Sequence, residues 1–178
     1  MIDSWASADY LAQLRRIRYL GNICLVLELD RSLSSTYWLN VNDPDFPFVG
    51  VIEHTNFIHP DTYNGRHIVY FSKYLPPSDP LYTMGADELL AFALPYLQKM
   101  FPAFEKNWIK NHYLWRARWA QPIVEQGYSA MMPANQGLQN GFYVCSMAQI
   151  YPEDRGTNYA IRDGRKIGRI VAEHIGKV

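Results

Sequence analysis

Residues 141–160 read GFYVCSMAQIYPEDRGTNYA, and they pass through three kinds of local structure. The apolar run from Phe142 to Cys145, introduced by a glycine, predicts a short buried strand. A polar turn with a proline and a glycine follows, and a helix begins at about Thr157, with Thr157 or Asn158 as its cap. Such a strand, turn and helix start form a site for negative charge, because the first backbone N–H groups of a helix lack partners and point outward.

The helix that this stretch opens is predicted to extend to about Ile175. Its apolar stripe comprises Ala160, Gly164, Ile167, Gly168, Val171 and Ile175. The two glycines lower the helix propensity by about 1 kcal/mol each relative to alanine. They are tolerable where this face of the helix must approach another backbone closely.

The run from Met147 to Ala160, with the Phe-Tyr-Val segment before it, resembles the C-terminal FAD-contacting segment of the flavin-containing amine oxidoreductase superfamily. That superfamily includes protoporphyrinogen-oxidase-like and UDP-galactopyranose-mutase-like proteins. The resemblance implies that the helix start lies beside the isoalloxazine ring of FAD. It assigns cofactor binding to Met147, Arg155, Gly156, Thr157, Asn158 and Tyr159. On spacing alone, an ordinary strand–turn–helix with a capped start is the simpler interpretation.

Enzymes of this superfamily hold the ADP half of FAD with a G-x-G-x-x-G motif between a strand and a helix, and this chain contains no such motif. The resemblance therefore implies that residues 1–140 correspond to a substrate-binding domain, and residues 141–178 to the last strand and helix of the FAD-binding domain. The N-terminal dinucleotide-binding half would be absent, because the chain is a fragment, its gene is truncated, or another polypeptide supplies that half in trans. We expect the chain alone to bind FAD weakly.

The remaining pattern predicts an α+β fold, a mostly antiparallel sheet with flanking helices. Strands are predicted at 23–29, 36–41, 48–56, 66–74 and 108–120, and helices at 7–20 and 85–100. The short connections, rich in Pro, Asp, Asn and Gly, favour antiparallel pairing. Gly21 is predicted to end the first helix, and Pro95 to bend the second.

The strand at 108–120 has two chemically different faces. One face carries Ile109, Tyr113, Trp115, Ala117 and Trp119, and the other carries Lys110, His112, Arg116 and Arg118. Two arginines at this spacing suit a carboxylate or phosphate on a substrate, so Arg116 and Arg118 are candidate substrate-binding residues. A solvated sheet face is the alternative interpretation.

Composition narrows the choice of partners. The 178 residues suit one domain, or one and part of another, and 48% of them are hydrophobic, which is enough for a core. Lys and Arg total 17 against 17 Asp and Glu, and this balance argues against nucleic acid as the partner. No apolar run reaches the roughly 20 residues of a membrane span, and no signal peptide is recognisable, so we expect a cytoplasmic protein. Cys24 and Cys145 lie in apolar runs, which favours buried free thiols over a disulfide.

Three functions remain open at this stage. The first is FAD-dependent oxidation of a small molecule, with the flavin as the redox group. The second is a UDP-galactopyranose-mutase-like isomerisation, and the third is a non-catalytic binding or assembly module that retains the fold. No catalytic residue stands out, and the five histidines show no spacing that completes a metal site.

Self-association is also expected. The resemblance implies that the cofactor domain packs against the last strand and helix. Without that domain, five apolar side chains would be uncovered: Phe142, Val144, Ile167, Val171 and Ile175. The predicted strand at 142–146 would also expose an edge that invites pairing with another copy. We therefore expect a homo-oligomer.

Overall fold

The chain forms two compact units in the computed structural model, which describes Ser4 and residues 6–136 and 141–176. The sheet unit is Tyr19–Gln121, and the terminal unit combines Met1–Arg18 with Pro122–Val178. The assignment of residues 1–140 to substrate binding and 141–178 to cofactor binding stays a prediction, and its boundary at residue 140 lies outside the described residues.

The sheet unit contains a five-stranded sheet in the order β2-β3-β4-β1-β5. Its strands are β1 (Tyr19–Leu29), β2 (Trp38–Asn40), β3 (Gly50–Glu53), β4 (His67–Leu75) and β5 (Ile109–Pro122). The pairs β1–β4, β3–β4 and β2–β3 are antiparallel. Bonds from Asp30 N–H to Trp108 O and from Ile123 N–H to Arg18 O give β5 the opposite direction to β1 as well. The expected antiparallel α+β fold is confirmed.

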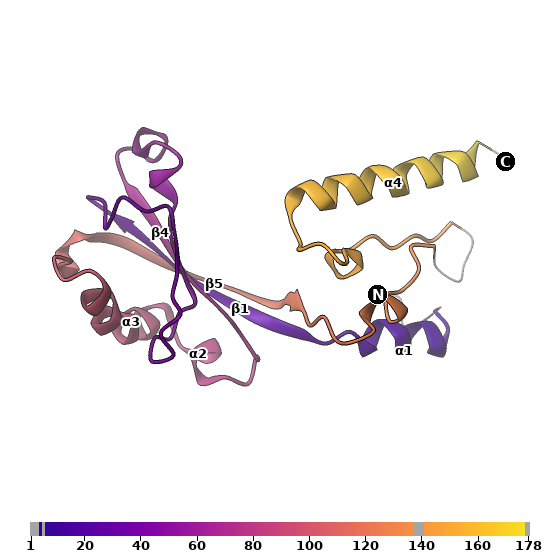
Figure 1. Ribbon diagram of the computed structural model, residues 1–178, viewed down its shortest axis with the longest axis horizontal. Coiled ribbons are helices and arrows are strands. Elements are labelled where there is room, and N and C mark those ends of the chain that lie inside the picture. The colour runs from indigo at the N-terminus through magenta and orange to yellow at the C-terminus, as the bar shows by residue number, and fades with distance from the viewer. Residues whose placement is uncertain (1–3, 5, 137–140, 177–178) are drawn as a thin grey trace. The chain divides into compact units, whose positions relative to one another are not determined.

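Two helices, α2 (Pro80–Thr83) and α3 (Ala86–Met100), cover one face of the sheet (Figure 1). The odd-numbered residues of β1 from Ile23 to Leu29 are fully buried on that face. They share a hydrophobic core with Leu89 and Leu97 of α3 and Phe71 of β4. Burying one such side chain contributes roughly 1.5–3 kcal/mol, so this layer is the main source of the unit's stability.

Gly21 does not end a helix, which corrects the sequence prediction. Helix α1 (Ala8–Arg16) ends earlier, and Gly21 is buried within β1. A Cβ at this position would lie 2.9 Å from the ring of Tyr82 and 3.2 Å from the carbonyl oxygen of Ala117. Close packing therefore explains this glycine, and a left-handed backbone does not.

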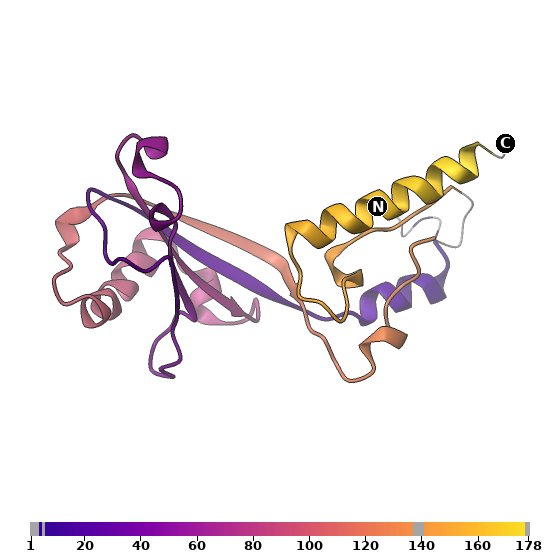
Figure 2. The same ribbon diagram turned by 45° about the horizontal axis from the view of Figure 1, so that its top comes forward.

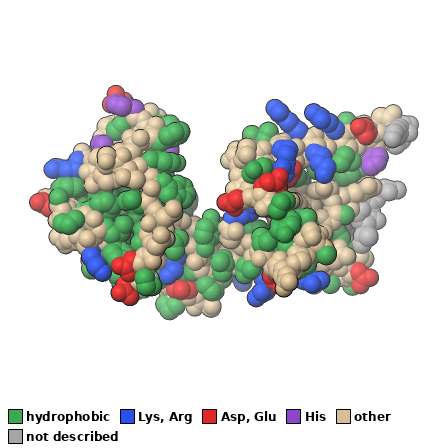
Figure 3. Space-filling model, in the orientation of Figure 1, with side chains coloured by type: hydrophobic (Ala, Val, Ile, Leu, Met, Phe, Trp, Pro, Cys, Tyr) green, Lys and Arg blue, Asp and Glu red, His purple; other side chains and the backbone are tan. Residues whose placement is uncertain are grey.

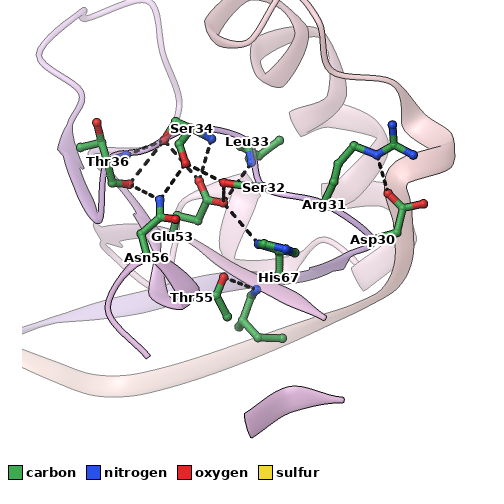
Figure 4. Close-up of polar contacts among 11 residues, drawn as sticks. Asp30, Arg31, Ser32, Leu33, Ser34, Thr36, Glu53, Thr55, Asn56 and His67 are labelled. Atoms are coloured by element: carbon green, nitrogen blue, oxygen red, sulfur yellow. Dashed lines mark hydrogen bonds and ion pairs between the residues drawn. The ribbon is translucent and has the colours of Figure 1, made fainter. Parts of the chain in front are cut away.

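The predicted strand at 48–56 is also too long. Strand β3 ends at Glu53, and two short 3-10 helices follow, η1 (His54–Asn56) and η2 (Pro60–Tyr63). Glu53 is only 2% exposed. Figure 4 shows its hydrogen bonds to the loop that precedes β2. The Glu53 carboxylate accepts hydrogen bonds from the backbone N–H groups of Leu33 (3.0 Å) and Ser34 (2.9 Å). The hydroxyls of Ser32 (2.5 Å) and Ser34 (3.2 Å) donate to it as well. These bonds hold the loop between β1 and β2 on the end of β3.

Replacing Glu53 by Ala should destabilise the sheet unit, because the buried carboxylate that accepts from two N–H groups and two hydroxyls would be removed, and the two N–H groups would lose their acceptor. We expect the free energy of unfolding to fall by about 3 kcal/mol, against less than about 0.5 kcal/mol for the exposed Glu105→Ala. Urea unfolding followed by tryptophan fluorescence measures this, since Trp38, Trp108, Trp115 and Trp119 all lie in this unit. Equal effects of the two substitutions would contradict the role assigned to Glu53.

The terminal unit is built on α1 and α4 (Thr157–Ile175), with the 3-10 helices η4 (Tyr128–Ala130) and η5 (Met147–Gln149). In Figures 1 and 2 the segment 141–156 lies between α1 and α4. The unit's buried side chains include Tyr10, Ile17, Tyr128, Met131, Ala148, Ile150 and Ile167. The hydroxyl of Tyr128 donates to the carbonyl oxygen of Ala148 at 2.7 Å, which joins the segments 122–136 and 141–156 in the core.

The predicted buried strand at 142–146 is wrong. An isolated bridge joins Gln136 to Tyr143, and Cys145 is exposed instead of buried. Asn135 explains the difference, because its carbonyl oxygen accepts from Val144 N–H at 2.7 Å and its side chain donates to Val144 O at 3.1 Å. The segment is thus bonded to a loop and not to a strand. Cys24 and Cys145 are both free thiols, as expected, although Cys24 is only half-buried.

The loss of this strand removes the sheet edge on which the expectation of self-association partly rested. Of the apolar set, Ile167 is buried and Ile175 is exposed. Self-association stays a prediction, and light scattering at micromolar concentration tests it. A dimer mass would support it, and a monomer mass would contradict it.

Candidate functional site

The start of α4 is the first part of the candidate site. Gly156 is the N-cap residue and provides no side-chain cap, which corrects the assignment of the cap to Thr157 or Asn158. The first helical hydrogen bond runs from Ala160 N–H to Gly156 O at 3.0 Å. Within the described ranges, no acceptor bonds the backbone N–H groups of Thr157, Asn158 and Tyr159. These groups can therefore donate hydrogen bonds to an external electron-rich or negatively charged atom.

Arg162 holds the preceding turn against this helix. Its guanidinium lies 2.7 Å from Glu153 and 2.7 Å from Asp163, and it covers the ring of Tyr159 at 4.9 Å. The hydrogen bond from Arg162 lowers the pKa of Glu153 below its usual range. Exposed ion pairs contribute little to stability, so the main consequence is a fixed orientation of the turn.

The sequence-predicted cofactor residues lie on both sides of this turn. Met147 begins η5 and is exposed, and Arg155 is half-buried. The backbone N–H of Arg155 donates to Asp154 Oδ1 at 2.8 Å. The side-chain oxygen of Asn158 lies close over Gly156, since a Cβ there would be 2.5 Å from it. Cofactor binding by Met147 and by residues 155–159 stays a prediction.

These residues fit one part of FAD. Free N–H groups at a helix start suit the electron-rich edge of a flavin ring. The sequence has no dinucleotide-binding motif for the pyrophosphate and adenosine. The residues present therefore offer donors for one edge of a flavin ring, and FAD binding by this chain stays a prediction.

A basic surface follows along α4. Arg165, Lys166 and Arg169 line a hollow of about 610 Å³ with Asn158, Ile161, Arg162 and Ile170. Figure 3 shows Lys and Arg side chains gathered along this helix. The stripe predicted to be apolar is mostly uncovered, and added Cβ atoms at Gly164 and Gly168 would meet nothing within 4 Å. The close backbone approach that would explain these glycines is therefore not made within the described part of the chain.

The two predicted substrate arginines have different surroundings, and Arg116 lies on the helix-covered side of the sheet unit. Arg116 donates through Nε to the carbonyl oxygen of Tyr82 at 2.6 Å and through Nη2 to that of Met84. His112, on the same side of β5, lies 2.9 Å from Asp87 of α3. Arg118 is exposed, with its guanidinium 5.2 Å from the ring centroid of Trp119. A substrate anion would have to displace two carbonyl oxygens from Arg116, and substrate binding by this pair stays a prediction.

Arg116 and Arg118 should therefore differ in their effect on stability. Replacing Arg116 by Ala removes two hydrogen bonds to carbonyl groups at the end of α2, and we expect the free energy of unfolding to fall by about 1–2 kcal/mol. Replacing Arg118 by Ala should change it by less than about 0.5 kcal/mol. Urea unfolding of both variants measures the difference. A larger loss for Arg118→Ala would contradict the structural role of Arg116.

The aromatic side of β5 is the side that α2 and α3 leave uncovered. The sequence alone did not indicate which side this would be. Asn111 donates to Glu28 at 2.7 Å and Tyr113 donates to the same carboxylate at 3.1 Å, so odd residues of β5 share a face with even residues of β1. The hydrogen bond to Glu28 raises the pKa of Tyr113. Trp115 and Trp119 are each 67% exposed on this face. We call it the open face of the sheet.

A polar hollow of about 420 Å³ lies at one end of the open face. It is lined by Glu28, Thr62, Tyr63, Asn64, Arg66 and Ile68. Neither Glu28 nor Arg66 has an ion-pair partner among the residues that the structure describes. Close by in η1, His54 Nε2 is 2.7 Å from the hydroxyl of Tyr63.

Two further properties limit the chemistry of the described residues. No group of three or more His, Cys, Asp or Glu side chains in the described ranges could hold a metal ion. No helix among these residues is long and apolar enough to cross a membrane.

Comparison with known proteins places the fold. No protein-family model matches the sequence, and neither does any curated protein. A protein from Exiguobacterium sp. 255-15 described as a protoporphyrinogen oxidase matches 68% of this chain at 15% identity and a TM-score of 0.53, over 27% of its own length. An oxidoreductase from Methanosarcina mazei matches 79% of this chain at 18% identity and a TM-score of 0.53, over 33% of its own length. Reduced UDP-galactopyranose mutase matches 67% of this chain at 12% identity and a TM-score of 0.52, over 26% of its own length.

The chain thus spans a third or less of each of these proteins. At identities of 12–18% the likeness establishes a shared fold and no more. The resemblance drawn from residues 147–160 is confirmed at this level: the chain has the fold of one part of protoporphyrinogen-oxidase-like and UDP-galactopyranose-mutase-like proteins.

Proposed function

We propose that this chain forms the flavin-facing and substrate-facing part of an FAD-dependent oxidoreductase that acts on a small molecule. The dinucleotide-binding half comes from elsewhere, in the same polypeptide or in a partner. The observation that carries the proposal is the start of α4, which has no side-chain cap. Three of its N–H groups donate no hydrogen bond to any described residue. This helix start follows directly on the segment that resembles the FAD-contacting segment of this superfamily.

FAD, when bound, supplies the redox chemistry. The chain contributes the N–H groups of Thr157, Asn158 and Tyr159, which favour negative charge at the edge of the flavin ring. Arg162 and Glu153 keep the turn before these groups in place. Substrate contact is assigned to the open face of the sheet unit, where Trp115 and Trp119 are exposed.

A sugar-nucleotide isomerase of the UDP-galactopyranose-mutase type is the second candidate. Its support is the fold shared with that mutase at a TM-score of 0.52. A sugar nucleotide carries a pyrophosphate, which needs cationic side chains. Arg116, the best-placed candidate in the sequence, is bonded to two carbonyl oxygens. A non-catalytic module with this fold is the third candidate, and it would bind no flavin.

The purified chain alone should contain no stoichiometric FAD, because the missing motif carries most contacts to the pyrophosphate and adenosine. The absorption spectrum of the purified protein measures this directly. A yellow preparation with one flavin per chain would contradict the division of the binding site between two parts.

The native assembly tests the proposal itself. The tagged chain, isolated from its own cells, should co-purify with FAD and with polypeptide sequence that contains G-x-G-x-x-G. Replacing Asn158 by Pro removes one N–H donor within the first helical turn, where proline is tolerated, and should lower flavin occupancy. Asn158→Ala keeps the N–H group and should retain the flavin. A native assembly without flavin would refute the proposal, and equal flavin content in both variants would exclude this helix start from the flavin site.

A further inference from the structure

The open face consists of side chains that the strand register places together. They are Asn22, Cys24, Val26 and Glu28 of β1, Ile68, Tyr70, Ser72 and Tyr74 of β4, Gly50 and Ile52 of β3, Trp38 and Asn40 of β2, and Asn111, Tyr113, Trp115, Ala117 and Trp119 of β5. Glu28 is the one charged residue among these strand positions. Aromatic and aliphatic side chains make up most of the remainder. Ile52 and Ile68 are buried, so the uncovered apolar surface comes from the aromatic side chains, among which Trp38 is 55% and Tyr74 45% exposed.

Most cations of the same strands point to other surroundings, and the exception is Arg118, whose guanidinium lies 5.2 Å from the ring centroid of Trp119. Arg116 is bonded to carbonyl oxygens at the end of α2, and Lys110 pairs with Asp30 at 2.7 Å. Lys73 is paired in register with Ile23, whose side chain lies in the helix-covered core. A ligand on the open face therefore meets aromatic rings and no cluster of positive charge.

The polar hollow makes one end of the open face polar, whereas the rest of the face is mainly apolar. At its end of the face, Tyr113 and Asn111 fix the carboxylate of Glu28, and Arg66 lines the same hollow without an ion-pair partner in the described part of the chain. Hydroxyl and amide groups of Thr62 and Asn64 complete the lining. One carboxylate and one guanidinium suit an uncharged polar group, and they do not suit a multiply charged phosphate.

We propose that the open face binds a flat, mainly apolar molecule without phosphate groups, which stacks on its aromatic side chains and places a polar end in the hollow lined by Glu28 and Arg66. Taking this molecule as the substrate rests on the proposed function. The occupant follows from complementarity: aromatic rings stack on flat apolar molecules, and a pyrophosphate in the hollow would lie beside the carboxylate of Glu28 with the guanidinium of Arg66 to balance it.

Cys24 provides a reporter on this face. Replacing Cys145 by Ser leaves Cys24 as the single thiol of the chain. Burial raises the pKa of the Cys24 thiol, so labelling with a maleimide is run above neutral pH. The probes are 1-pyrenemethanol, which is flat and uncharged, and UDP, which is anionic. Pyrenemethanol should protect Cys24 from labelling in a saturable manner, and UDP should not.

Substitutions locate the binding surface. Trp115→Lys places a charge on the open face and should weaken pyrenemethanol binding by about tenfold. Val124→Lys, at a 54% exposed position of the terminal unit, is the matched control and should leave the affinity unchanged. Circular dichroism and urea unfolding verify that each variant is folded, and Trp115→Ser replaces Trp115→Lys if the lysine variant is not.

Two results would overturn the inference. The first is protection of Cys24 by UDP equal to that by pyrenemethanol, and the second is equal weakening by Trp115→Lys and Val124→Lys. Flavin takes no part in this measurement. A chain that binds pyrenemethanol on the open face while its native assembly lacks flavin would refute the proposed function and leave this site standing. A flavin-containing assembly whose open face prefers UDP would refute this inference and leave the proposed function standing.

Discussion

The sheet unit depends on the burial of the odd-numbered residues of β1 against α3. Ile23, Leu25, Leu27 and Leu29 are each 0% exposed, and they share the core with Leu89 and Leu97. Because successive side chains of a strand point to opposite faces, this burial also fixes which residues lie on the other face. The open face with Trp115 and Trp119 is thus a direct consequence of the packing that stabilises the fold. An antiparallel sheet commonly leaves one face to solvent, but that face is usually polar, and here it is aromatic.

The two units carry different parts of the proposed chemistry. The terminal unit offers backbone N–H groups at the start of α4, and the sheet unit offers an aromatic face with a polar hollow. Among the described residues of both units, no carboxylate or histidine has surroundings that assign it a catalytic role. This division is consistent with an enzyme in which a bound cofactor supplies the reactivity and the protein supplies orientation and charge stabilisation.

Much of this architecture was predictable from the sequence, and the exceptions share a cause. Strong periodicity placed β1, β4, β5, α3 and α4 within a few residues, and alternation separated Trp115 from Arg116 on the two sides of β5. The alternation of side chains along β5 does not show which of its two faces packs against a helix. Only the tertiary structure shows that the aromatic face is exposed. The predicted strand at 142–146 failed for the same kind of reason, since a strand needs a neighbour and Asn135 supplies a loop instead. Glu53 was not singled out, because its partners lie about twenty residues earlier in the chain.

The central claim is that one face of the sheet is packed and the aromatic face is left open. Hydroxyl-radical footprinting of the purified chain, read by mass spectrometry, tests it most directly. Trp115 and Trp119 are 67% exposed, and they should be oxidised much faster than Phe71 and Tyr128, which are 2% and 1% exposed. Protection of both tryptophans to the level of Phe71 in the chain alone would contradict the account.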